Sequence, residues 1–308
     1  MSTTASAPRA TPPTSPTPPT TPQRSAATIS GGRRRRRFGT GAALVVLLVI
    51  AVIYIFPFLV QISTSFKTEG DAANNPMSLI PQTWSTAAYS RLFNNSDFPL
   101  WARNSFIVTL AVTLGRVFFD SLAGYALARL RFPGRQVVFY LLIAVMSVPG
   151  VVLLIPKFLV INYLGIYDTF AAMIFPLLVD AGGVFMMRNF FMSIPESVEE
   201  AARIDGAGTF RTYWSIVLPM ARPALMTIII LSFQGSWNEF SHFLIATQSP
   251  GLRTLTTGVA TLASGGLGGG TQYPLKLGAA LLMTVPAAII FFVFQRQIMN
   301  TTGGAVKD

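Results

Sequence analysis

Six long apolar stretches constrain the fold of this 308-residue chain more than any other feature of its sequence. The first runs from Gly41 to about Val60. About 20 helical residues are enough to cross the ~30 Å hydrocarbon core of a bilayer. The other five stretches occupy approximately residues 105–127, 136–160, 170–187, 220–245 and 275–294. None shows the apolar–polar alternation of a membrane-barrel strand. The sequence therefore predicts an all-α, polytopic membrane protein with six transmembrane helices.

The overall composition agrees with a membrane protein and excludes several other classes. Hydrophobic residues make up 51% of the chain, charged residues only 11%, and the mean hydropathy is +0.53. A soluble domain carries roughly 25% charged residues, so this chain cannot coat a soluble body of its size. Its apolar content also excludes global disorder. The chain has no cysteine, which excludes disulfides, a thiol nucleophile and cysteine-ligated metal sites.

The N-terminal region has a composition of its own. It is rich in Pro, Thr, Ser and Ala and ends in five consecutive arginines, Arg33–Arg37. Such a segment cannot bury enough apolar surface to offset the entropy of ordering, so we expect residues 1–37 to be disordered. A signal peptide is the alternative, but Gln61–Lys67 offers no small-residue cleavage site. We therefore expect a retained first helix and a membrane domain over residues 38–308, with its core at 103–298.

The net charge of +11 is best explained by membrane topology. If the six stretches span the membrane, 14 Lys and Arg residues fall on the side of the arginine run and 6 on the other. The positive-inside rule then predicts that both termini are cytoplasmic. A nucleic-acid footprint is the alternative explanation of Arg33–Arg37. No aromatic-interleaved basic surface accompanies the run, so we expect no nucleic-acid partner.

The loop between the fourth and fifth stretches, residues 191–222, has strong helix signals. Ser193 and Glu196 have the spacing of a capping box, and Gly206 suits a helix C-terminus. A second helical pattern follows over residues 209–218. A short helix that protrudes from the membrane can dock in a groove of another protein. A plain structured loop is the alternative explanation.

Fixed residues in this loop carry a resemblance to a known family. Glu200-Ala201-Ala202 is followed by Gly206 after three residues, by Ile216 after nine more, and by Leu218-Pro219. This pattern resembles the EAA signature of ABC-importer permeases. Further matches to the maltose-type second permease of the carbohydrate-uptake branch are Ala123–Gly134, Ile155-Pro156, Leu164-Gly165, Ser236–Phe240 and Gly303–Lys307. The resemblance covers about residues 41–308 and is to a binding-protein-dependent transport system inner membrane component.

The resemblance implies a fold, a location and a set of partners. The fold would be that of a type I ABC-importer permease in the bacterial plasma (inner) membrane. The partners would be a second permease chain in a heterodimer, two copies of an ABC ATPase, an extracytoplasmic solute-binding protein, the lipid bilayer and a sugar. Residues 63–103 and the glycine-rich segment 264–271 would face the binding protein. The expected ATPase-coupling residues are Glu200, Ala201, Ala202, Asp205, Gly206 and Pro219.

The chain itself is expected to be neither an enzyme nor a cofactor protein. No lysine follows a glycine, so the GxxxxGK[ST] phosphate-binding loop cannot occur. ATP and magnesium would belong to the partner ATPase. An ion-gradient-driven secondary transporter is the main alternative, but it predicts repeated halves, and we find no convincing repeat. An intramembrane hydrolase is a third possibility, but Ser236 and His242 would point in different directions from one helix. We therefore expect no catalytic residue.

Charged and polar residues inside the apolar stretches are functional candidates because they are costly there. Arg116 and Asp120 are four apart and can pair on one helix face. A structural pair is the alternative to a function. Sequences of the resembling family are usually apolar at these positions, which argues against a family-wide role. Candidates for the translocation path are Asp180, Gln234, Trp237, Asn238 and Glu239, with helix packing as the alternative for the last four. His242 has no accompanying ligand cluster, so we expect a packed residue and no metal site.

Overall fold

The computed structural model describes the backbone of residues 32–264 and 272–303, and every regular element in these ranges is helical. The α-helices are α1 (Gly32–Ser65), α2 (Glu69–Asn74), α3 (Ala87–Asn94), α4 (Phe98–Arg129), α5 (Arg135–Met146), α6 (Leu154–Tyr163), α7 (Phe170–Ile174), α8 (Ala181–Ser193), α9 (Glu196–Ile204), α10 (Thr209–Thr212), α11 (Leu218–Met220), α12 (Arg222–Trp237), α13 (Ser241–Ala246), α14 (Leu255–Ala263) and α15 (Tyr273–Gly303). Short 3-10 turns occupy Gly150–Leu153, Phe175–Leu177 and Pro250–Leu252, and Tyr213–Val217 is a π-helical turn. The Pro/Thr-rich segment 1–31, the glycine-rich segment 265–271 and residues 304–308 lie outside the described residues.

The chain divides into two compact units, residues 1–54 and 55–308. The described part of the first unit is the N-terminal portion of α1. This helix begins at Gly32, so the arginine run Arg33–Arg37 has a helical backbone. The boundary that the sequence placed after residue 37 therefore falls within α1. All elements from α2 onward belong to the second unit.

Helix length and composition support the predicted number of membrane spans. Four segments in the described part of the chain are long and apolar enough to cross a membrane: Ala43–Ser65, Phe98–Arg129, Phe170–Ser193 and Tyr273–Gln295. Two bent pairs pass the same test, Arg135–Met146 with Gly150–Tyr163 and Thr209–Met220 with Arg222–Trp237. Six spans result if each pair crosses once. The chain is therefore an all-α, multi-pass membrane protein, as predicted.

Three of the expected spans are not continuous helices. The third bends by 105° between α5 and α6, because Pro149 lacks an N–H and disfavours helical geometry in the residue before it. The fourth is interrupted between the 3-10 turn at Pro176 and Asp180, which is extended. The fifth, predicted over residues 220–245, consists of α12 and the separate helix α13. Apolar composition alone does not reveal such interruptions.

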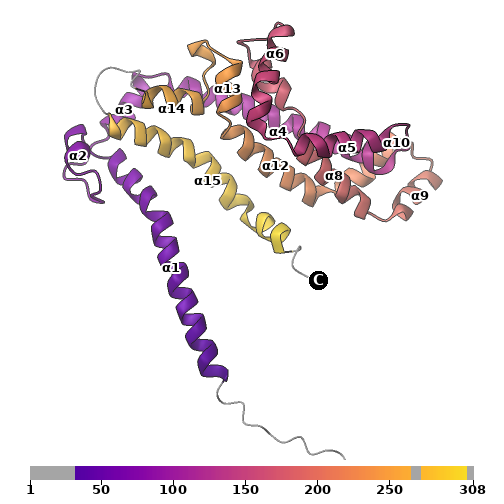
Figure 1. Ribbon diagram of the computed structural model, residues 1–308, viewed down its shortest axis with the longest axis horizontal. Helices are drawn as coiled ribbons and strands as arrows, with labels where there is room; N and C mark the ends of the chain where they lie inside the picture. Colours follow the sequence, from indigo (N-terminus) through magenta and orange to yellow (C-terminus); the bar gives the residue numbers. More distant parts are fainter. Residues whose placement is uncertain (1–31, 265–271, 304–308) are drawn as a thin grey trace, which may run out of the picture. The chain divides into compact units, whose positions relative to one another are not determined.

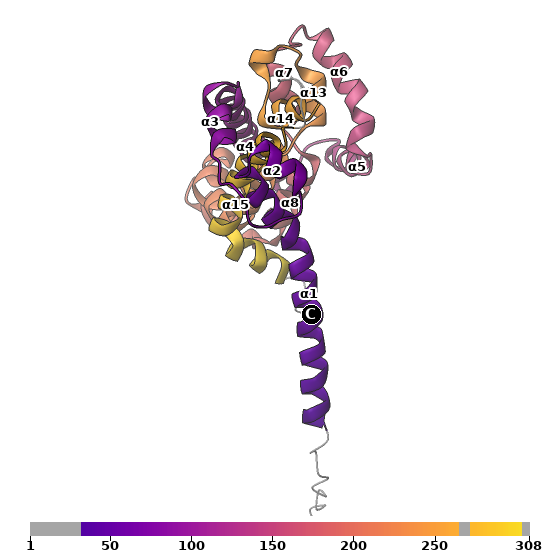
Figure 2. The same ribbon diagram turned by 90° about the vertical axis from the view of Figure 1, so that its left-hand side faces the viewer.

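The second unit has two ends that carry different loops. Figure 1 shows α9 and α10 at one end of this unit and α3 and α14 at the other. Figure 2 shows α6, α7 and α13 grouped together, and α13 contacts both α6 and α7. The loop helices predicted on opposite sides of the membrane, α9 and α10 against α3 and α14, thus lie at opposite ends of this unit. We call the end with α9 and α10 the coupling end, and the end with α3 and α14 the opposite end.

A carboxylate fastens two loops where α6, α7 and α13 meet. Asp168 has a positive φ of 56°, and its N–H donates to the carbonyl of Ala246 at 3.0 Å. Its Oδ1 accepts from the amides of Gln248 and Ser249, both at 2.9 Å. The Ser249 hydroxyl and these amides hold the pKa of Asp168 below its usual value, because hydrogen bonds to the ionised form favour it. The two loops are thereby held together at one place.

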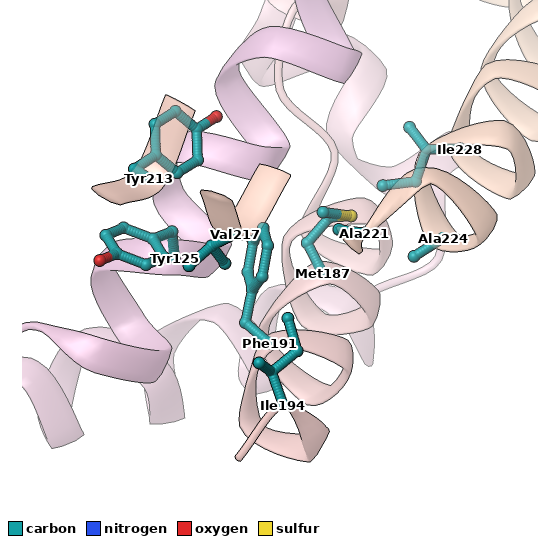
Figure 3. Close-up of a cluster of buried hydrophobic side chains, with 9 residues drawn as sticks. All are labelled: Tyr125, Met187, Phe191, Ile194, Tyr213, Val217, Ala221, Ala224 and Ile228. Carbon is teal, nitrogen blue, oxygen red and sulfur yellow. The ribbon is translucent and has the colours of Figure 1, made fainter. Parts of the chain in front are cut away.

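Close contact between α4 and α8 forms the core near the coupling end. The buried cluster in Figure 3 joins these helices to the segment from Tyr213 to Ile228. Gly124 makes the approach possible, because a Cβ there would lie 2.6 Å from Met187 Cβ and 2.9 Å from the Arg188 backbone nitrogen. Small residues serve this purpose in membrane helices, where backbones pack closely.

We predict that Gly124→Ala destabilises the fold by about 1–3 kcal/mol, the usual cost of overpacking. The added methyl group meets backbone on α8, which cannot move as a flexible side chain can. Thermal unfolding of the purified protein in detergent would measure the change. Gly150→Ala is the matched control, because nothing lies within 4 Å of a Cβ at that position. Equal unfolding temperatures for the two variants would contradict the prediction.

Candidate functional site

The loop at the coupling end contains a short helix that begins differently from the prediction. Helix α9 starts at Glu196, directly after Pro195, and has no side-chain cap. The capping box expected from Ser193 and Glu196 is wrong, because the Ser193 hydroxyl instead donates to the Phe190 carbonyl at 2.7 Å. Ser193 is the last residue of α8, where free carbonyls are available. Its side chain therefore belongs to α8 rather than to α9.

The predicted end of this helix is confirmed. Gly206 has a φ of +76°, a conformation that favours glycine. Its N–H donates to the Arg203 carbonyl at 3.0 Å, and the N–H of Ala207 donates to the Ala202 carbonyl at 2.9 Å. These two bonds form a Schellman motif, which satisfies the last carbonyls of the helix. The chain then turns sharply into α10.

Most of the predicted coupling residues are exposed. The side chains of Glu200, Ala201 and Asp205 face solvent, as do Gly206 and Pro219, whereas Ala202 is 3% exposed and faces the body. Two apolar residues beside them are also open, Ile204 at 86% and Phe210 at 70% exposure. Exposed apolar side chains beside a small-residue surface are typical of an interaction site. The sequence pattern does not single out Ile204 or Phe210, although large apolar residues within a few positions of a helix-terminating glycine are a usable signal.

A buried arginine attaches α9 to the membrane helices. Arg129 is the last residue of α4, and its side chain is 7% exposed. Its Nε lies 3.2 Å from Glu199 Oε1, and its Nη1 lies 3.8 Å from Glu196 Oε1. Its Nη2 donates to the carbonyls of Phe191, at 2.7 Å, and Ile194. One guanidinium thus joins the C-terminal ends of α4 and α8 to the first turn of α9.

The sequence pattern does not single out Arg129 and Glu199 as a pair. Their pairing depends on the α4–α8 contact, which the sequence does not reveal. Arg129 lies in Ala123–Gly134, one of the segments that resemble the family, but that resemblance names no partner for its side chain.

Aromatic rings attach the second arm of the loop. The ring of Tyr213 lies 5.0 Å from that of Tyr125 between centroids, and Tyr125 meets Phe191 edge-on at 5.7 Å. Figure 3 shows these side chains among the buried residues of α4, α8 and the π-helical turn. The Tyr213 hydroxyl lies 2.8 Å from Ser121 Oγ. Both arms of the loop therefore rest on α4 and α8.

A polar cavity of about 700 Å³ lies between the end of α4 and the α9–α10 segment. Its charged lining residues are Arg129, Arg131, Arg135, Arg203, Glu196 and Glu199. Arg129 is paired with the two glutamates, while Arg135 donates to the Ala128 carbonyl at 3.0 Å. The excess of arginine gives this cavity a positive character.

The structure gathers three of the predicted intramembrane residues, but not as an ion pair. Arg116 and Asp120 form no salt bridge in the described structure. Instead, Arg116 Nε donates to the Leu177 carbonyl at 2.8 Å, and Asp120 Oδ1 accepts from the Asp180 amide at 2.9 Å. Asp180 caps α8 by accepting from the Gly183 amide at 3.0 Å. The interruption of the fourth span therefore brings Asp180 to Asp120.

The other translocation-path candidates lie elsewhere. Trp237 is 1% exposed, donates to the Met283 carbonyl at 3.0 Å and packs against Phe106 and Phe233. Its ring faces are therefore unavailable for a solute in this conformation, which agrees with the packing alternative. Asn238 donates to the carbonyl of Gln234 at 2.9 Å.

Glu239 and His242 have local structural contacts. Glu239 Oε1 accepts from the His242 amide at 2.8 Å in the first turn of α13. His242 is 1% exposed, with its Nε2 3.1 Å from the Ala172 carbonyl. Within the described residues, no group of three or more His, Cys, Asp or Glu could hold a metal ion.

Residues 120–300 match the family described as binding-protein-dependent transport system inner membrane component. The chain belongs to this family. This permease is 31% identical over 255 residues to the sn-glycerol-3-phosphate transport system permease protein UgpE of Yersinia pestis bv. Antiqua, covering 80% of the chain and 90% of that relative. It is 32% identical to the arabinooligosaccharides transport system permease protein AraQ of Halalkalibacterium halodurans, covering 84% and 93%.

The fold of the permease also matches a solved structure. A chain in the crystal structure of a bacterial ABC transporter involved in the import of the acidic polysaccharide alginate superposes with a TM-score of 0.77, at 24% sequence identity. The match covers 86% of the permease and 98% of that chain. The permease is a transporter subunit rather than an enzyme, and ATP hydrolysis belongs to a separate subunit in this family.

We predict that Arg129→Gln destabilises the permease by about 3 kcal/mol, because it leaves Glu199 buried without its partner. Thermal unfolding in detergent would measure the loss. Arg131→Gln is the control, because Arg131 is exposed and forms no ion pair in the described structure. The prediction is wrong if both variants unfold at the wild-type temperature.

Proposed function

We propose that this permease forms, with a second and similar permease chain, the membrane path of an ATP-driven importer. Helix α9 docks on a separate ATPase and couples nucleotide-driven movement to the spans. The observation that carries the proposal is the division of the α9–α10 loop. Its tip, with Glu200, Ala201 and Gly206, is exposed, while its base is attached to α4 and α8 through Arg129.

This division provides a mechanical route from the tip to the membrane. A force on α9 acts on Glu199 and hence on Arg129, which also binds the last carbonyls of α8. A force on α10 acts through Tyr213 on Tyr125 and Ser121 of α4. Because both arms reach the same two helices, the loop moves them together. Opening and closing of the path on alternate sides follows from such movement.

The solute and partners are proposed from the family. The names of the relatives concern sn-glycerol-3-phosphate and arabinooligosaccharides, so we assign a saccharide or a related polyol to this permease. The family description supports an extracytoplasmic solute-binding protein. Two ATPase copies bind ATP and magnesium, and this chain carries no cofactor of its own. An ion-gradient-driven transporter predicts no role for the tip of α9, which makes the two functions separable by experiment.

We predict that Glu200→Ala lowers ATP-dependent uptake by about tenfold, because one lost interface contact of about 1.4 kcal/mol corresponds to that factor. Gly206→Pro abolishes coupling, since proline fixes φ near −65° and Gly206 has +76°. Uptake and ATPase rates are measured in membrane vesicles that contain the complete importer. Ser197→Ala is the control, because Ser197 is exposed on the same helix. Normal transport in both coupling variants, or uptake without ATP, would overturn the proposal.

We propose further that both termini and the coupling end are cytoplasmic in a bacterial plasma membrane. The chain has no cysteine, so single cysteines report sidedness without a background signal. We expect an impermeant maleimide to label Trp84→Cys in intact cells and Arg131→Cys only after the membrane is opened. Both positions are exposed, so each thiol is accessible to the reagent from its own side of the membrane. The reverse labelling pattern would contradict this orientation.

A further inference from the structure

A second cavity, of about 530 Å³, lies among α4, α8, α12 and the end of α5. Its volume lies within the range of small-molecule sites, about 300–1,000 Å³. The polar lining residues are Arg116, Asp120, Asp180, Asn189 and Ser232. The rest of the lining is largely apolar, with Phe185 and Leu231 among it. The cavity reaches the surface at Asn189 and Leu231, which are both exposed.

One carboxylate oxygen in this cavity has no partner. Asp120 is 0% exposed, and its Oδ1 accepts from the Asp180 amide. Its Oδ2 is buried and has no hydrogen-bond partner among the described residues. The absence of a side chain at Gly183 makes room for this oxygen, because a Cβ there would overlap it. A buried polar atom without a partner is costly, so a donor on a bound solute would remove that cost.

Arg116 supplies donors beside this acceptor. Only its Nε is engaged, with the Leu177 carbonyl at 2.8 Å. Its two terminal nitrogens have no hydrogen-bond partner among the described residues, and Nη1 lies 3.7 Å from where a Cβ on Gly235 would be. A guanidinium donates only, and a carboxylate accepts when ionised. A hydroxyl both donates and accepts, so a solute with several hydroxyl groups satisfies both residues at once.

We propose that this cavity is a solute-binding station for an uncharged, hydroxyl-rich solute on the translocation path. This inference rests on the importer function proposed above. The cavity combines one guanidinium with two carboxyl groups, Asp120 and Asp180. The one guanidinium is matched by these acid groups, so the cavity has no excess positive charge to offset the desolvation of a phosphate or carboxylate on the solute. The cavity therefore selects neutral saccharides over phosphate esters and acidic sugars.

The main test uses vesicles with the complete importer and three variants. Asp120→Asn and Arg116→Gln alter the cavity. Thr113→Val is the matched control, because Thr113 lies on the same helix and does not line the cavity. The probes are maltose, N,N′-diacetylchitobiose, arabinobiose and sn-glycerol 3-phosphate. The readouts are ATP-dependent uptake and ATPase stimulation by the binding protein.

We expect uptake of at least one neutral probe by the wild type and no uptake of sn-glycerol 3-phosphate. In both cavity variants we expect uptake to fall at least tenfold while ATPase stimulation is retained, so more ATP is hydrolysed per solute moved. Wild-type uptake in both variants would overturn the cavity assignment and leave the importer function intact. Uptake of sn-glycerol 3-phosphate alone would overturn the neutral-solute specificity. Failure of wild-type ATP-dependent uptake with every probe would overturn the importer function, and with it this inference.

A second measurement tests the proposal if the Asp120→Asn and Arg116→Gln variants do not accumulate in the membrane. Asn189→Cys places a single thiol at the exposed mouth of the cavity without altering a buried residue. We expect 2-(trimethylammonium)ethyl methanethiosulfonate to react several-fold faster than the anionic 2-sulfonatoethyl reagent, relative to their rates at Trp84→Cys, which is exposed and lies outside the membrane spans. Equal relative rates, or a faster anionic reagent, would overturn the proposed charge selectivity.

Discussion

The ion pair between Arg129 and Glu199 is the contact on which the rest of the coupling end depends. It is buried, and a buried ion pair contributes little net stability compared with apolar packing. Its value lies in geometry, because the same guanidinium also binds two carbonyls at the end of α8. Three chain segments are thereby fixed at one point. Separating the segments would leave a buried charge without its partner, so they do not separate gradually.

Arg116 and Asp120, which lie within a span, are also bound by backbone groups of another segment. The interruption before α8 turns a backbone amide and a helix N-terminus toward Asp120, and glycine at residue 183 keeps that approach open. A continuous helix would have used these amides within its own hydrogen-bond ladder. The same interruption therefore creates the cap on α8 and one wall of the 530 Å³ cavity. Local backbone irregularity here is the origin of the polar environment.

The sequence predicted the features that depend on composition and local pattern. The all-α fold, up to six spans and the glycine stop of α9 all follow from runs of apolar residues and single-residue conformational rules. The misjudged features depend on tertiary contacts. Ser193 lies between α8 and α9, and its hydroxyl binds a carbonyl of α8 instead of capping α9. Arg116 and Asp120 had the spacing to pair, yet each found a backbone partner on another segment. Trp237 packs against Phe106 and Phe233, and its place on a translocation path stays a prediction.

The bend between α5 and α6 limits which part of the chain can face lipid. At Ser147–Pro149 the helical ladder is broken, and α5 has no buried residue within this chain. Backbone carbonyls at such a break cannot face hydrocarbon, where nothing would satisfy them. The α5–α6 edge must therefore be turned toward another protein surface or toward water. One irregular tripeptide thus excludes this edge from the part of the chain's circumference that faces lipid.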